Sequence, residues 1–241
     1  KELNMKRLLG LLLVMGMVGC GDPVAELKRL GAEIEQNEQG EVIGVDNAFR
    51  KFTDADLVQL KGLSRLQMLD LTNTEITDAG LVHLKGLANL ETLLIGVTKI
   101  TDAGLVHLKG LTNLKYLELT DCRQLTDAGL AHVKDLTNLQ TLNLRFTLVT
   151  GAGLVQLAGM NLKELQIPDQ AQTDTGLKHY LEAVKPPTEL SLFRWKKITD
   201  AGLVHIKELT KLRELDLRFT KVTDAGIAEL QEALPNCEIT K

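Results

Sequence analysis

Five histidines recur at one position of the chain and form its most regular set of potential metal ligands. Each lies six residues after a recurring threonine; they are His83, His107, His132, His179 and His205. Imidazole nitrogens are common zinc ligands. The same position holds Gln59, Gln156 and Glu229 elsewhere, and no cysteine or carboxylate accompanies it. Packed helices lie about 10 Å apart, too far for neighbouring rings to share an ion. We therefore predict solvated helix positions and no metal site.

The cysteines and aspartates are the next candidates for chemistry. Cys122 and Cys237 lie about five repeats apart, which is beyond the reach of a disulfide. Neither has a histidine or basic partner beside it in the sequence, and Cys122 replaces a threonine that we expect to point into the core. The aspartates occur once in each repeat, so they do not pair as in glycosidases. Phosphate-binding glycine loops, nucleophile elbows and zinc-helix motifs are missing. We predict no enzyme, no cofactor and no small-molecule substrate.

A repeat of about 24 residues positions all of these side chains. The string Thr-Asp-Ala-Gly-Leu begins at Thr77, Thr101, Thr126 and Thr199. Apolar residues precede each string at fixed spacing, as in Leu66, Leu69 and Leu71. Leucines two apart predict a short half-buried strand. Leu81, Leu84 and Leu87 predict the apolar face of a helix, with Thr77 as its N-cap and Gly86 at its end.

Eight such copies fill most of the chain, which resembles the leucine-rich repeat family. The likeness is greatest to the ribonuclease-inhibitor-like and cysteine-containing subclasses, whose units carry a helix. The resemblance implies an α/β fold, a curved solenoid of about eight strand–helix repeats. It places a parallel sheet on the concave face and helices on the convex face. It also implies a non-catalytic protein-interaction module, because members of this family mostly bind other proteins.

The first twenty residues have the features of a processing signal. Lys6 and Arg7 precede an apolar run from Leu8 to Val18, and Cys20 follows. The segment resembles a bacterial lipoprotein signal, with Met17 in the usual leucine position and Cys20 as the residue that receives the lipid. The resemblance implies a lipoprotein of the bacterial cell envelope, anchored to a membrane by its lipid alone and facing the periplasm or the cell surface.

These features predict the boundaries of the chain's parts. Residues 1–19 form the signal peptide, with residues 1–4 upstream of a translation start at Met5. Residues 20–41 form an N-terminal cap of a short helix and a hairpin, residues 42–233 form the repeats, and residues 234–241 form a C-terminal cap strand. The whole is one domain, and no apolar run is long enough for a transmembrane helix.

Charge and composition limit the partners. The chain has 28 basic and 32 acidic residues, for a net charge of −4, which argues against a nucleic-acid partner. Leucine makes up about a fifth of the chain and aromatic residues only 3%, so we expect an aliphatic core. Loss of residues 1–19 removes three basic residues and one acidic residue, and the charge becomes −6. An anionic protein is not attracted to lipid headgroups, so membrane association needs the lipid.

The concave positions change in character along the chain. In the second and third repeats they are bland, as in Met68 and Thr92. In the fifth, seventh and eighth repeats they include arginines and phenylalanines, which are enriched at the centres of interfaces. The predicted partner-binding residues are Arg145, Phe146, Phe193, Arg194, Asp216, Arg218 and Phe219. Gln166, Pro168 and Asp169 of the sixth repeat predict a polar gap among them.

Two interpretations of these residues stay open. In one, the phenylalanines are exposed and a protein partner binds them. In the other, they fold back over the strand ends, a role that Trp195 also fits because it takes an inward position. The leading hypothesis for function is recognition of a protein through the concave face. The alternative is a structural spacer of the cell envelope that has no specific ligand.

Overall fold

From the second repeat to the eighth, each strand is three residues long and has one inward leucine between two outward residues. The computed structural model describes residues 22–241, and the predicted signal segment and Cys20 lie outside that part. In each repeat strand the central leucine is buried, as Leu69 and Leu117 are at 0% exposure, and its two neighbours face the concave side. The strands are β1 (Glu33–Gln36), β2 (Val42–Asp46), β3 (Met68–Asp70), β4 (Thr92–Leu94), β5 (Tyr116–Glu118), β6 (Thr141–Asn143), β7 (Glu164–Gln166), β8 (Glu189–Ser191), β9 (Glu214–Asp216) and β10 (Glu238–Thr240).

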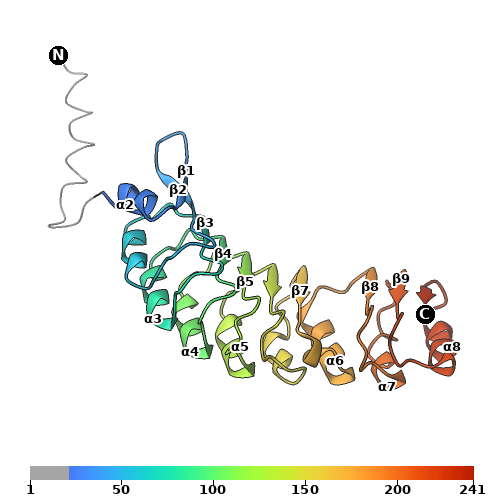
Figure 1. Cartoon of the computed structure of the whole chain (residues 1–241). Coiled ribbons are helices and arrows are strands. Elements are labelled where there is room, and N and C mark those ends of the chain that lie inside the picture. The colour runs from blue at the N-terminus through green and yellow to red at the C-terminus, as the bar shows by residue number, and fades with distance from the viewer. Residues whose placement is uncertain (1–21) are drawn as a thin grey trace, which may run out of the picture.

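Helical segments cover the other side of the stack (Figure 1). The α-helices are α2 (Pro23–Arg29), α3 (Asp78–Leu81), α4 (Asp102–Leu105), α5 (Asp127–Val133), α6 (Asp174–Ala183), α7 (Asp200–Leu203) and α8 (Asp224–Ala233). The 3-10 helices are η1 (Asp56–Leu60), η2 (Val82–Leu84), η3 (Val106–Leu108), η4 (Gly153–Leu157) and η5 (Asp169–Ala171). The strands follow the inner side of the curve and the helices its outer side, so the predicted curved α/β solenoid with a concave sheet is confirmed.

A short helix and a hairpin begin the part of the chain that the structure describes. Asp22 caps α2 by accepting a hydrogen bond from the backbone N–H of Val24, and Pro23 is the first helical residue. Strand β1 pairs antiparallel with β2, which then pairs in parallel with β3. The first repeat strand is therefore covered on its outer edge. None of the helices in residues 22–241 is long and apolar enough to cross a membrane.

A carboxylate joins successive helices in most of the stack. In each such junction an aspartate at the start of one helix accepts two hydrogen bonds from the threonine that caps the next. Asp102 accepts from the backbone N–H of Thr126 at 2.8 Å and from its hydroxyl at 2.6 Å. A Cβ at Gly129, three residues after Thr126, would overlap the same carboxylate. The recurring Thr-Asp-Ala-Gly string is therefore a junction between repeats as well as a helix start.

One junction lacks this carboxylate. Gly151 replaces the aspartate in the fifth repeat, and its Cα packs against Gly176 of α6. Thr173 still caps α6 by accepting from the N–H of Gly176, but no aspartate of the preceding repeat bonds to it within residues 22–241. The fifth repeat forms the 3-10 helix η4 in place of an α-helix.

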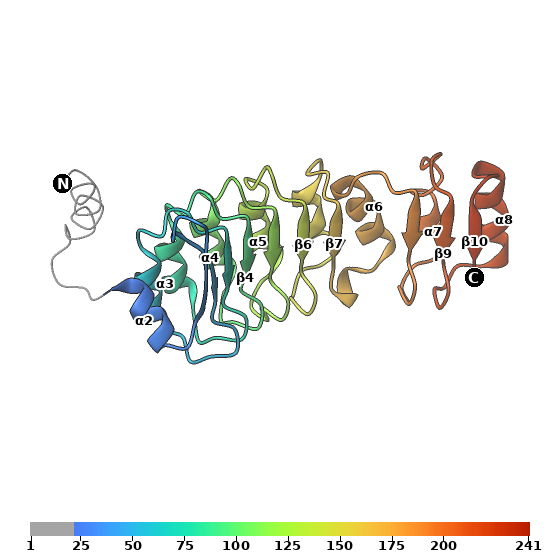
Figure 2. The ribbon, with the colours of Figure 1, turned by 90° about the horizontal axis from the view of Figure 1, so that it is seen from above.

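The sheet is also interrupted, although the sequence predicts one continuous sheet. Strands β1 to β7 form one seven-stranded sheet, and β8, β9 and β10 form a second sheet of three strands. Figure 2 shows β8 set apart from β7. In regular repeats a backbone N–H after the strand donates to the next repeat, as from Asp121 to the carbonyl of Arg145. In the sixth repeat Asp169 occupies the position of Asp121, and within residues 22–241 its N–H makes no such bond to the carbonyl of Phe193 in the seventh.

Candidate functional site

Four of the seven predicted site residues form one compact group on the last two repeats. The rings of Phe193 and Phe219 meet edge to face with centroids 5.3 Å apart. The guanidinium of Arg194 lies 5.2 Å from the Phe193 centroid and 5.9 Å from that of Phe219. The guanidinium of Arg218 lies 5.3 Å from the Phe193 ring. We call Phe193, Arg194, Arg218 and Phe219 the Arg/Phe cluster.

A reversal of residue order creates these contacts. The fifth and eighth repeats read Leu-Arg-Phe-Thr after the strand, whereas the seventh reads Leu-Phe-Arg-Trp. Neighbouring parallel strands place equivalent positions side by side, about 4.8 Å apart. Phe193 therefore lies beside Arg218, and Arg194 lies beside Phe219. Each cation meets an aromatic face in place of a second cation, an arrangement that contributes cation–π energy.

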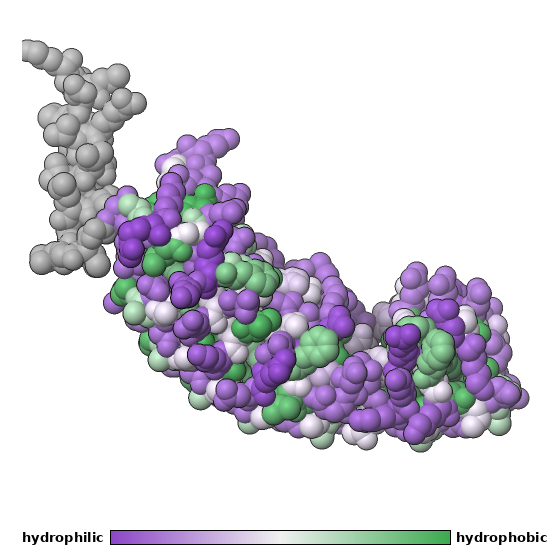
Figure 3. Space-filling model, in the orientation of Figure 1, coloured by the Kyte–Doolittle hydropathy of each residue, from purple (hydrophilic) through white to green (hydrophobic). Residues whose placement is uncertain are grey.

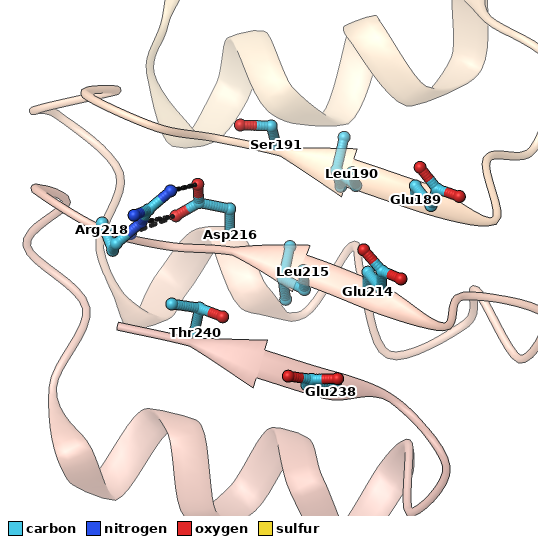
Figure 4. Close-up of a pocket in the computed structure, with 9 residues that line it drawn as sticks. All are labelled: Glu189, Leu190, Ser191, Glu214, Leu215, Asp216, Arg218, Glu238 and Thr240. Carbon is cyan, nitrogen blue, oxygen red and sulfur yellow. Dashed lines mark hydrogen bonds and ion pairs between the residues drawn. The ribbon is translucent and has the colours of Figure 1, made fainter.

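Asp216, the fifth predicted residue, anchors one arginine of the cluster. Its carboxylate accepts hydrogen bonds from Nε of Arg218 at 3.0 Å and from a terminal guanidinium nitrogen at 2.7 Å (Figure 4). The hydrogen bond from Arg218 holds the pKa of Asp216 below its usual value. The same contact raises the pKa of Arg218 further. Arg218 is therefore oriented by a carboxylate on one side and by the Phe193 ring on another.

Arg145 and Phe146, the remaining two predicted residues, form a separate pair. The Arg145 guanidinium lies 5.3 Å from the Phe146 ring. The interruption between β7 and β8 lies between this pair and the Arg/Phe cluster. The polar sixth repeat lies between the two groups, and its strand β7 pairs with β6 of the fifth repeat and not with β8 of the seventh. Arg145 and Phe193 nevertheless line the same open hollow.

The predicted phenylalanines are exposed. Phe146 is 60% exposed, Phe219 is 66% exposed and Phe193 is 38% exposed. Trp195 is the aromatic residue that points inward, at 9% exposure, and its ring meets Tyr180 edge to face at 5.6 Å. The interpretation in which the phenylalanines cover the strand ends is therefore wrong, and that role belongs to Trp195.

Backbone conformation gives a second reason to regard these positions as unusual. Phe146, Arg194 and Phe219 have φ angles of 60°, 64° and 62°, in the left-handed region. Bulky residues are rare there, because their Cβ approaches the carbonyl and costs about 1–2 kcal/mol. The second repeat uses Asn73, a residue that tolerates this conformation. An exposed phenylalanine at such a turn contributes nothing to the core, which favours a role in contacts with other molecules.

The sequence analysis missed two features of the same surface. Phe49 occupies the equivalent turn of the first repeat, with φ 58° and 74% exposure, and its position in the repeat could have revealed it. Glu189, Glu214 and Glu238 form a row across β8, β9 and β10, because each begins its strand and pairs in register with the next. Figure 4 shows their side chains beside one another on the three-stranded sheet. Their spacing of 24 or 25 residues was the available signal.

The histidines and cysteines are part of the framework of the repeats. The five histidines are half-buried; four lie in helical segments and His205 lies in the turn after α7. Nδ1 of His179 lies 2.8 Å from a carboxylate oxygen of Glu182. Within residues 22–241 no group of three or more histidine, cysteine, aspartate or glutamate side chains could hold a metal ion. Cys122 is fully buried and lies 3.4 Å from the carbonyl oxygen of Ile95. Burial raises the pKa of the Cys122 thiol, which disfavours a nucleophilic thiolate.

Comparisons with known proteins agree with this architecture. A family described as "Leucine Rich repeat" matches residues 65–84, 110–131 and 208–230. Internalin C2 from Listeria monocytogenes str. 4b F2365 is similar in structure, with a TM-score of 0.56 and 22% identity over 91% of this chain and 92% of that chain. A structure of PEPR1-AtPEP1 has a TM-score of 0.44 and 14% identity over 86% of this chain and 36% of that chain. No curated protein matches the sequence. The fold of residues 22–241 is that of a leucine-rich repeat protein.

Proposed function

We propose that this protein is a non-catalytic interaction module that recognises a partner protein with the Arg/Phe cluster on its concave side. The observation that carries the proposal is the compact set of ring and guanidinium contacts among Phe193, Arg194, Arg218 and Phe219 at an exposed site. Interface centres are rich in arginine and aromatic residues because these bury large areas and lose little conformational freedom. The assignment to the ribonuclease-inhibitor-like or cysteine-containing subclass stays a prediction.

The surface around the cluster supports a protein partner. An apolar and cationic centre lies beside the acidic row of Glu189, Glu214 and Glu238, so both charge signs occur over a small area. Such mixed surfaces give an interface its orientation and its selectivity for one partner. Figure 3 shows an apolar patch set among hydrophilic residues towards the C-terminal end of the visible face. A spacer with no ligand would not require exposed phenylalanines at strained turns.

Site-specific photo-crosslinking tests this proposal. A benzophenone-bearing phenylalanine analogue is placed at Phe219 in intact cells that express the protein, and crosslinked proteins are identified by mass spectrometry. Phe49 is the matched control, because it has the same left-handed turn and similar exposure but lies outside the cluster. We expect a discrete crosslinked protein from position 219 and none from position 49. No product at 219, or the same products at both positions, would contradict the proposal and favour the spacer.

We also propose that the protein is held at a bacterial membrane outside the cytoplasm by a lipid on Cys20. The support is the arrangement of Lys6, Arg7, the apolar run and Cys20 in the sequence. We expect the protein to partition into detergent and its N-terminal peptide to carry acyl mass. The variant Cys20→Ser should release the protein or leave the signal uncut. An intact, unmodified segment from Met5 to Cys20 on the mature protein would contradict this proposal.

A further inference from the structure

The interruption of the sheet opens a hollow on the side that carries the predicted site residues. Gln170 of η5 donates hydrogen bonds to the carbonyls of Thr147 and Val149, at 2.6 and 3.0 Å. These bonds hold the turn of the sixth repeat against the fifth. Strands β7 and β8 do not pair within residues 22–241, an isolated bridge joins Thr173 to Lys197, and a hollow of about 670 Å³ lies between the two repeats. Figure 3 shows a notch in the outline before the C-terminal block.

Cations dominate this hollow, which we call the basic hollow. Its walls include Arg145, Asp169, Phe193, Arg194, Lys196 and Lys197. Four cations and one carboxylate give a local charge of +3 in a chain whose net charge is −4. None of these four cations forms an ion pair within residues 22–241, whereas Arg218 nearby is paired with Asp216. Unpaired cations around a concave site attract and hold anionic groups.

An apolar hollow adjoins the basic one. Val97, Phe146 and Leu148 line it and are 40%, 60% and 56% exposed. Gln170 contributes to both hollows, and Phe146 lies under the guanidinium of Arg145, which belongs to the basic hollow. The two sites therefore form one continuous surface with an apolar end and a cationic end.

We propose that these two hollows bind an extended acidic segment of the partner protein, with carboxylates in the basic hollow and a large apolar side chain in the apolar hollow. The inference rests on the proposed function and specifies the chemistry of the partner. Carboxylates pair well with arginine because the guanidinium offers two parallel N–H groups.

The surroundings favour a short acidic segment over a long polyanion. Glu189, Glu214 and Glu238 lie on the three-stranded sheet beside the Arg/Phe cluster. At physiological salt, charges act over about 8 Å. A nucleic acid or polyphosphate that extended beyond the basic hollow would meet this acidic row, whereas a segment with a few carboxylates ends within the hollow.

Peptide binding to the full chain tests the inference. The probe is a fluorescein-labelled peptide, Leu-Gly-Asp-Glu-Asp-Glu, and its reference replaces the acids by Asn and Gln. Fluorescence polarisation is measured at low and at physiological salt. We expect the acidic peptide to bind about tenfold more tightly than the amide peptide, with affinity falling as salt rises. Equal affinity of the two peptides would overturn the inference.

Two charge-reversed variants locate the binding site. Lys196→Glu with Lys197→Glu should weaken binding of the acidic peptide about tenfold. Lys61→Glu with Lys85→Glu is the matched control, because both lysines are exposed, lie in early repeats and change the net charge equally. We expect that control to stay within about twofold of the parent protein. Equal losses in both pairs would overturn the inference, because binding would then follow overall charge alone.

The same fluorescence-polarisation measurement distinguishes an acidic peptide from a nucleic acid as the ligand. It also distinguishes failure of this inference from failure of the proposed function. A labelled oligodeoxythymidylate that binds more tightly than the acidic peptide would overturn the inference in favour of a nucleic acid. Lys196 and Lys197 lie outside the Arg/Phe cluster, so these results are independent of crosslinking at Phe219. Crosslinking at Phe219 without selectivity for the acidic peptide would preserve the proposed function and remove only this inference.

Discussion

The early repeats and the last two repeats share one scaffold but differ on their concave side. In β2 to β6 the position in register with Met68 is uncharged: Gly44, Met68, Thr92, Tyr116 and Thr141. In β8 to β10 the same position is glutamate three times. The inward leucines do not change between the regions, since Leu69 is 0% and Leu215 is 1% exposed. The comparison teaches that the buried positions maintain the stack, while the outward positions are free to take up a function.

The turns after the strands differ in the same way. Asn73 follows β3 in the left-handed conformation, which asparagine tolerates. Phe219 follows β9 in that conformation and meets Arg194 and Phe193. Phe49 shows that an exposed phenylalanine alone does not make a cluster, because no ring or guanidinium contact joins it to another residue among those described. Neighbouring repeats must supply the complementary arginine and the second ring.

The largest expected effect comes from inward leucines of the two sheets. Leu117→Ala and Leu215→Ala should each lower the free energy of unfolding by about 2–5 kcal/mol, measured in urea, because each leaves a cavity. In hydrogen exchange we expect Leu215→Ala to reduce protection mainly in β8–β10, because the ladder is interrupted before β8. His83→Ala is the control and should change stability by no more than about 0.5 kcal/mol. An equal loss of protection in β3–β5 would show that the interruption does not separate the two regions.

The next largest effect concerns the junctions between helices. Thr126→Ala removes an N-cap and the hydroxyl bonded to Asp102, so it should lower the free energy of unfolding by about 2 kcal/mol. Thr173→Ala removes only a cap, because Gly151 stands where the aspartate would be, and should cost about 1 kcal/mol. Thermal and urea unfolding measure both. Equal costs would mean that the hydrogen bond from the Thr126 hydroxyl to Asp102 contributes nothing to the junction.

Affinity for the partner should depend on the arginines and phenylalanines of the later repeats and not on the concave residues of the early repeats. Phe219→Ala and Arg145→Ala should each weaken binding of the crosslinked partner by about 1–2 kcal/mol, or roughly 5- to 30-fold in Kd, at an unchanged Tm. Phe49→Ala, and substitutions at Met68 or Thr92, should leave the Kd unchanged. Calorimetry or surface plasmon resonance provides the measurement. Unaltered binding by the Phe219 and Arg145 variants would move the binding site elsewhere on the molecule.

Relief of the left-handed turns should stabilise the protein slightly. Phe49→Asn should raise the free energy of unfolding by about 0.5–1 kcal/mol, because asparagine tolerates a positive φ better than phenylalanine. Phe219→Asn should give a smaller gain, since it also removes contacts with Phe193 and Arg194. The reverse change, Asn73→Phe, should lower the Tm. A destabilised Phe49→Asn variant would show that this ring contributes to folding.

The smallest effect is a pH dependence at the last helix junction. The hydroxyl of Thr223 donates to Asp200 and holds the pKa of that carboxyl below its usual value. A lowered folded-state pKa means that the stabilisation is present above the unfolded value, near pH 4, and is lost as pH falls through the folded value. We expect the stability difference between the parent protein and Asp200→Asn to shrink between pH 6 and pH 3. A constant difference would mean that Asp200 does not titrate with folding.

Much of the candidate site could be predicted from the sequence by aligning the repeats. Once Leu142, Leu190 and Leu215 align, Arg145, Phe193 and Arg218 must occupy equivalent positions after their strands. Their exposure did not follow, because the inward or outward direction of a turn residue depends on its φ angle, as for Trp195 and Arg194. The same alignment of repeats also gives the residues of the acidic row equivalent positions. Their side chains form a row, however, only because the strands of the C-terminal sheet pair in register.

The sequence by itself determined the solenoid, the direction of the strands and the identity of the core. Leucines at a fixed spacing can all be buried only if each repeat packs on the next, so the pattern allows one architecture. The tertiary structure alone decided where the sheet is interrupted and which arginine meets which ring. Those features depend on hydrogen bonds such as that from Gln170 to Thr147, 23 positions apart, which holds the turn of the sixth repeat against the fifth. Such contacts have no counterpart in the local pattern, because their energies are set only after the repeats have stacked.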